Sequence, residues 1–223
     1  MLFRSCTHGV GHGLAHYYHD LTQGLSACKG FPVLWEQRNC DQGLFMEYAN
    51  EVVRTPARLS NPGDYLSPCE AGEPHQRYDC YHYLISLVYW ASGGSVQATF
   101  AECEKTRSTD KSGCYSGIGR GLFGQYIERE DELVRVCRSG DDAYATDCDL
   151  GFLGVLVNFT SLDRGFGFCA KLSEEARTRC SEKMGWIVRL YQPTKEAIQA
   201  ECRKAGAPPY IQTCLDAKLN TGE

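Results

Sequence analysis

Thirteen cysteines recur along this chain of 223 residues in two interleaved series. The first series comprises Cys6, Cys40, Cys80, Cys114, Cys148, Cys180 and Cys214, and the second comprises Cys28, Cys69, Cys103, Cys137, Cys169 and Cys202. Steps within each series are 32 to 34 residues, except for one longer interval near residues 54–78. A period of about 34 residues predicts an array of structural repeats, because each unit of such an array is one supersecondary element.

Apolar residues follow the cysteines of the first series at a helical spacing. Four residues after each of these cysteines stand Val10, Leu44, Leu84, Ile118, Phe152 and Met184, and eight residues after stand Leu14, Tyr48, Val88, Leu122, Leu156 and Val188. Positions i and i+4 share one face of a helix, so we expect a long helix that buries this face. Segments such as "DELVRVC" and "TKEAIQAEC" predict a second, shorter helix that ends near each second-series cysteine.

Two amphipathic helices per repeat predict an all-α fold, a right-handed α-solenoid of about six helix–turn–helix repeats. We expect one domain over residues 1–223, with a terminal half-repeat near Cys214. The turn-forming strings "NPGDYLSP" and "EAGEPH" lengthen the second unit. The repeat units start near Cys6, Cys40, Cys80, Cys114, Cys148 and Cys180.

The period and the cysteine placement resemble the tetratricopeptide and Sel1-like class, especially the Sel1-like proteins whose repeats are stapled by disulfides. The resemblance covers almost the whole chain. Ten or eleven residues separate the paired cysteines here, more than in those proteins, and the small-residue consensus of the family is present only in part.

Two disulfide schemes fit the cysteine spacing. The first joins the end of each short helix to the next long helix: Cys28–Cys40, Cys69–Cys80, Cys103–Cys114, Cys137–Cys148, Cys169–Cys180 and Cys202–Cys214, which leaves Cys6. The second joins the two helices of one hairpin, starting at Cys6–Cys28, and leaves Cys214. In the second scheme, unequal distances from the turn separate the two cysteines by roughly 10 Å along straight helices, so the first scheme is favoured.

Composition limits the compartment and the partners. The chain has 28 acidic and 23 basic residues without a long basic run, which argues against binding to nucleic acid. No apolar stretch reaches the 18 residues of a transmembrane segment. Abundant cysteines without a CxxC motif indicate disulfides, and therefore a secreted or periplasmic protein. Because "MLFRSCTHGV" is not a signal peptide, we expect the export signal to be missing from this sequence.

The stretch "CTHGVGHGLAHYYHD" holds four of the six histidines. With Val10 and Leu14 on the buried face, these histidines are predicted to lie together on the opposite side of the helix. Imidazoles four residues apart on a helix can share a metal ion, so we consider a site for zinc, copper or haem, which Met46 or Glu47 on the next long helix could complete. The four candidate ligands are His8, His12, His16 and His19. A polar face and a contact with a further repeat are the alternative interpretations.

Glycines recur in the same register in "HGVGHG" and "SGIGRG". A glycine inside a helix costs about 1 kcal/mol relative to alanine. We therefore expect these glycines to allow close packing between helices.

The long helices are predicted to line a groove that binds a partner protein, a peptide or a small ligand. Candidate groove residues share the register of the N-terminal histidines or lie beside it: Gln42, Met46, Glu47, His82 and Arg120. The sequence thus favours a non-enzymatic binding scaffold. The competing class is a metal- or haem-dependent protein, such as a redox enzyme, built on the histidines.

Overall fold

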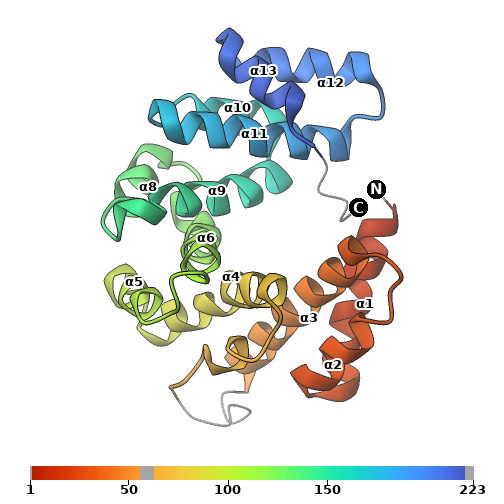
Figure 1. The fold of residues 1–223 in the computed structure, drawn as a ribbon. Coiled ribbons are helices and arrows are strands. Elements are labelled where there is room, and N and C mark those ends of the chain that lie inside the picture. Colours follow the sequence, from red (N-terminus) through yellow and green to blue (C-terminus); the bar gives the residue numbers. More distant parts are fainter. Residues whose placement is uncertain (1, 56–62, 219–223) are drawn as a thin grey trace.

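The computed structural model describes residues 2–55 and 63–218, and Figure 1 shows its ribbon. Within these ranges the chain folds into thirteen α-helices and two short 3-10 helices, with no strand. The predicted all-α fold class is therefore confirmed. No helix in these ranges is both long enough and apolar enough to cross a membrane.

Long and short helices alternate along the chain. The long helices are α1 (Leu2–Tyr18), α3 (Leu34–Arg54), α4 (Pro74–Ala91), α6 (Lys111–Gly121) with its continuation α7 (Phe123–Tyr126), α9 (Asp142–Phe159) and α11 (Glu174–Tyr191). The short helices are α2 (Leu21–Cys28), α5 (Val96–Glu104), α8 (Glu130–Cys137), α10 (Leu162–Cys169) and α12 (Lys195–Cys202). The 3-10 helix η2 (Ser67–Cys69) stands where a further short helix is expected, and residues 56–62 of that longer unit lie outside the described residues. The 3-10 helix η3 (Arg203–Ala205) and α13 (Pro208–Asp216) follow α12.

Polar residues define where four of the short helices begin. The side chains of Asp20, Ser95, Ser161 and Thr194 each accept a hydrogen bond from the backbone N–H three residues further on. Such an N-cap contributes about 1 kcal/mol, because it satisfies a donor that the helix leaves without a partner. The starts of these four helices are thus encoded locally in the sequence.

Six disulfides link the last turn of each short helix, or η2, to the first two turns of the α-helix that follows, which is a long helix in five cases and α13 in the sixth. The Cα–Cα distances are 5.4–5.6 Å, within the normal range for a disulfide. The pairs are those of the first scheme: Cys28–Cys40, Cys69–Cys80, Cys103–Cys114, Cys137–Cys148, Cys169–Cys180 and Cys202–Cys214. Cys6 is exposed and forms no disulfide.

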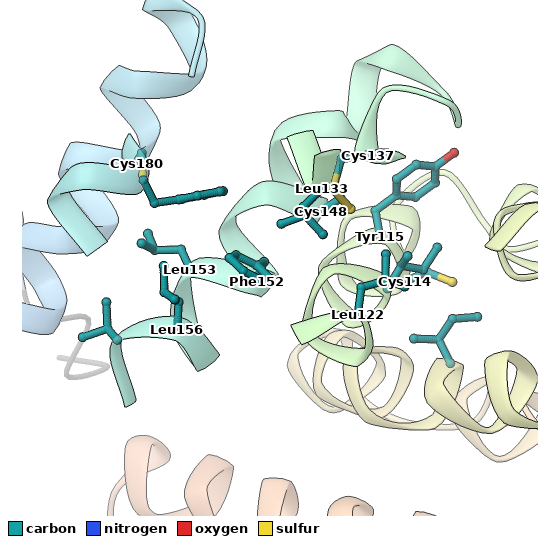
Figure 2. Close-up of a cluster of buried hydrophobic side chains, with 14 of the residues drawn as sticks. Cys114, Tyr115, Leu122, Leu133, Cys137, Cys148, Phe152, Leu153, Leu156 and Cys180 are labelled. Atoms are coloured by element: carbon teal, nitrogen blue, oxygen red, sulfur yellow. A yellow bond between two sulfur atoms is a disulfide. The ribbon is translucent and has the colours of Figure 1, made fainter. Parts of the chain in front are cut away.

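The predicted buried register holds from the second repeat onward. The residues four positions after the first-series cysteines are at most 3% exposed, and they are Leu44, Leu84, Ile118, Phe152 and Met184. Figure 2 shows part of this core, where Phe152 of α9 lies in the cluster that also holds Leu133 of α8 and Cys180 of α11. Each long helix therefore contributes one apolar face to a core shared with its neighbours.

The first repeat departs from this register. Val10 is 42% exposed, whereas Thr7 and Ala15 are buried. In the second repeat the equivalent residue, Leu44, packs against Gly24 of the preceding short helix α2. No short helix precedes α1 within the described ranges, so α1 has no counterpart of the contact between α2 and α3. Leu14 is only half-buried, so the prediction that Val10 and Leu14 form the buried face of this helix is wrong.

Glycines bring neighbouring long helices into backbone contact. A Cβ atom at Gly11 would lie 2.0 Å from the carbonyl oxygen of Cys40, and one at Gly43 would lie 2.0 Å from that of His8. Gly119 of α6 and Gly151 of α9 repeat this arrangement. A Cβ atom at either glycine would lie 1.8 Å from a carbonyl oxygen of the other helix.

The expected packing role holds for only some of the glycines in the two matching strings. It holds for Gly11, Gly117 and Gly119, which lie against the backbone of the next or the preceding long helix. A Cβ atom at Gly9 or Gly13 would have no neighbour within 4 Å, so packing does not explain these two.

Candidate metal centre

The close contact between α1 and α3 places the N-terminal histidines. The buried face of α1 is formed by Thr7, Gly11 and Ala15. His8, His12 and His16 each follow one of these residues, about 100° further around the helix. They consequently lie at the edge of the α1–α3 interface, and not on the side opposite the buried face as the sequence analysis predicts.

Two glutamates of α3 face the histidines of α1. The Nδ1 atom of His12 lies 2.9 Å from Oε2 of Glu47. His16 lies between two carboxylates, with Nε2 3.2 Å from Oε1 of Glu47 and Nδ1 3.0 Å from Oε1 of Glu51. One ligand atom from each of His16, Glu47 and Glu51 lies within 4.8 Å of the others. This is a set of three protein ligands of the kind that holds a catalytic or exchangeable metal ion.

Glu47 is the central acceptor of the cluster. Burial raises the pKa of this carboxyl, but hydrogen bonds from His12, Arg54 and Asn50 outweigh that effect and hold the pKa below its ordinary value. Arg54 makes the shortest of the ion pairs with Glu47, with Nη2 2.7 Å from Oε1. Glu47 is therefore ionised at neutral pH, as a metal ligand must be.

His8 and His12 face each other across one turn of α1. Their Nε2 atoms lie 3.3 Å apart, and their rings meet edge to face. The Nδ1 atom of His8 lies 3.3 Å from the backbone carbonyl oxygen of Asn39 in α3. Both rings thus turn Nδ1 toward α3 and Nε2 toward each other.

The cluster has a buried base and an open side. The side chains of Glu47 and Glu51 are 9% and 10% exposed, whereas that of His16 is 55% exposed. An ion could reach the site from solvent and keep an open coordination position.

His19 does not join the other histidines. It lies beyond the last residue of α1, is exposed, and has a φ of 53° in the left-handed region. The chain turns there toward α2, so His19 leaves the helical register that the sequence analysis uses. The group of three that the structure brings together contains Glu51 in place of His19.

The other candidate groove residues lie in separate contacts. Gln42 donates a hydrogen bond to Asp79 at 3.1 Å, and Met46 packs against the core. The Nδ1 atom of His82 lies 3.0 Å from Oγ of Ser116. The guanidinium carbon of Arg120 lies 4.3 Å from the ring centre of Tyr83. Of the five groove residues, only Glu47 belongs to the histidine cluster.

Burial and positive neighbours shift the pKa values of two of these residues, His82 and Arg120. Burial, together with the charges of Arg120 and Lys183, holds the pKa of His82 well below its ordinary value. Burial also lowers the pKa of Arg120. His82 is therefore neutral at pH 7 and lies beside a half-buried cation.

Sequence reasoning missed Glu51 and Asn39. Glu47 and Glu51 are four residues apart in "EYANE", the same spacing as His12 and His16. Two such pairs on adjacent helices form a four-ligand pattern, and this spacing was the signal that could have identified Glu51. Asn39 contacts His8 through its backbone carbonyl group, which no side-chain pattern reveals.

No family model matches this chain, and neither a curated protein nor a solved structure shows a significant similarity to it. The contacts of His16, Glu47 and Glu51 are therefore the basis for assigning a function to the site.

Proposed function

We propose that this chain is an extracytoplasmic repeat scaffold that binds a divalent metal ion between α1 and α3. The juxtaposition of His16, Glu47 and Glu51 is the observation that carries the metal site. The 34-residue period and the alternation of long and short helices support a right-handed α-solenoid of the Sel1-like or tetratricopeptide type. Six disulfides support an oxidising compartment, secreted or periplasmic.

The donor set favours zinc. One imidazole and two carboxylates are ligands of open zinc sites, in which water or a substrate takes the fourth position. Zinc ligands stand about 2.0–2.2 Å from the ion and therefore about 3.3–3.6 Å from one another. The three ligand atoms, which lie within 4.8 Å, would need to close by only about 1 Å. Copper(II) is the main competitor, because it binds such sites more tightly than zinc. Haem is less suited, because both nitrogens of His16 lie against carboxylates.

We expect His16→Ala and Glu51→Gln to weaken zinc binding strongly at pH 7.5. Each removes a direct ligand, so the loss should exceed the roughly 10–100-fold that removal of an outer-shell partner causes. Affinity should also fall as the pH is lowered, because protons compete with the metal for the imidazole. Calorimetric titration of zinc into metal-free protein measures both effects.

His19→Ala is the matched control, since it removes an exposed histidine from outside the group. It should bind zinc like the wild type. Equal zinc affinity in the wild type, His16→Ala and Glu51→Gln would show that the cluster is only an ion-pair network. In such a network, the imidazolium form of His16 donates a hydrogen bond to each carboxylate.

A second candidate function is ligand binding in the groove predicted along the long helices. Arg120 favours it: within the described ranges its guanidinium contacts the ring of Tyr83 but forms no ion pair. A half-buried cation without a carboxylate partner fits an anionic ligand, such as an acidic peptide or a small carboxylate.

Inorganic phosphate and a tetraglutamate peptide are the probes for this groove. Either should shift the NMR signal of His82, which lies beside Arg120, and Arg120→Gln should abolish the shift. Arg164→Gln, which removes an arginine paired with Glu128 and Glu130, should leave it unchanged. A shift that survives in Arg120→Gln would exclude this residue as the anion-binding group.

A further inference from the structure

The histidine pair in the first three turns of α1 has a geometry that the three-ligand site does not use. His8 lies outside the group formed by His16, Glu47 and Glu51, and the Nε2 atom of His12 points to His8 and not to the carboxylates. The two Nε2 atoms face each other, and their protonation determines whether a cation can bind between them.

The outer contacts favour the tautomer that carries its proton on Nδ1 in both rings. The Nδ1 atom of His8 lies against a carbonyl oxygen, which can only accept a hydrogen bond, so this nitrogen carries a proton. The Nδ1 atom of His12 lies 2.9 Å from the ionised carboxylate of Glu47 and carries a proton for the same reason. In two neutral imidazoles so arranged, both Nε2 atoms present lone pairs.

Two lone pairs that face each other at 3.3 Å repel unless a cation lies between them. Two imidazole nitrogens bound at about 2.0–2.1 Å to one tetrahedral zinc ion lie about 3.3–3.4 Å apart. The observed separation therefore equals the spacing of two ligands on one metal ion. The Nδ1 contacts are also those of ligating histidines, which donate their second N–H to a carbonyl or a carboxylate.

We propose that the Nε2 atoms of His8 and His12 form a second metal-binding subsite, adjacent to the three-ligand site. This inference extends the proposed function, but it depends on different ligand atoms. Glu47 connects the two subsites: it is a direct ligand in one and orients His12 in the other through Oε2. The side chain of His12 is 29% exposed, so water can complete the coordination of the second ion.

Copper(II) is the probe of choice for the pair, because two nitrogens form a weak site and copper(II) binds such sites most tightly. The His16→Ala variant removes a ligand of the first subsite and leaves the pair intact. We expect this variant to bind one copper(II) ion, with two nitrogen ligands visible by electron paramagnetic resonance. His8→Ala/His16→Ala should lose that signal, while its circular dichroism should stay that of a helical protein.

Ion counts in the single variants separate this inference from the proposed function. Two ions in the wild type, one in His8→Ala and one in His16→Ala would support both subsites. One ion in the wild type that His8→Ala retains and His16→Ala loses would overturn the second subsite alone. One ion that His8→Ala loses and His16→Ala retains would support the second subsite and overturn the first. No bound ion in any variant would mean that a proton lies between the rings, and would overturn both.

Discussion

Reduction of the six disulfides is expected to unfold most of this protein at room temperature. Each bridge closes a loop of 11 or 12 residues, which contributes about 3 kcal/mol in the loop-entropy description. The six together exceed the total stability of a typical domain, which is about 5–15 kcal/mol. In the repeat scaffold proposed above, stability comes from contacts between neighbouring units, so the loss should also make unfolding less cooperative.

Thermal unfolding followed by circular dichroism, with and without a thiol reductant, measures this effect. Cys103→Ser/Cys114→Ser removes one bridge from the middle of the chain and should lower the melting temperature by less than full reduction does. Cys6→Ser is the control, because Cys6 is exposed and forms no disulfide. A reduced sample that melts at the temperature of the oxidised one would show that the bridges add nothing to stability.

Replacing Asp149 by asparagine is expected to stabilise the protein at neutral pH. Asp149 is fully buried, neither of its carboxylate oxygens has a hydrogen-bond partner among the described residues, and Nη2 of Arg138 lies 3.6 Å from Oδ2. Burial raises the pKa of Asp149 to about 7, although the charge of Arg138 opposes this. The pKa of an aspartate in an unfolded chain is about 3.9.

The sign of the pH effect follows from this raised pKa. Below about pH 4 the carboxyl is protonated in both the folded and the unfolded states, so the contribution of Asp149 to stability is greatest. Between about pH 4 and pH 7 only the unfolded state releases the proton, and stability falls by at most about 4 kcal/mol. Above pH 7 both states are ionised and the contribution is constant.

Denaturant unfolding of the wild type and Asp149→Asn between pH 4 and pH 8 measures this difference. The stability advantage of the variant should grow across that range and level off above pH 7. Asp142→Asn, at an exposed position in the first turn of the same helix, should show no such growth. A difference between Asp149→Asn and the wild type that does not depend on pH would mean that Asp149 is ionised in the folded protein at every pH tested.

The helices and their covalent links follow from patterns that are local and repeated. An apolar residue four positions after each first-series cysteine is buried in every repeat from Leu44 onward, because the same helix pair surrounds it each time. The disulfide partners are neighbours in sequence, so the spacing of Cys103 and Cys114 was sufficient to favour their pairing. In each case the controlling interactions lie within one repeat or between successive repeats.

The candidate site depends on how two helices cross, which no periodicity encodes. The close approach of Gly11 and Gly43 turns a different face of α1 toward α3 than the cysteine register predicts. This orientation of α1 places His16 beside Glu47 and Glu51. Because α1 ends at Tyr18, His19 lies outside the group. Local patterns were thus enough to predict the helices and their buried register from Leu44 onward, and to favour the disulfide scheme that the structure contains over the alternative. Which side chains meet depends on the helix crossing, and that crossing is set by backbone contact between residues far apart in the sequence, such as Gly11 and Cys40.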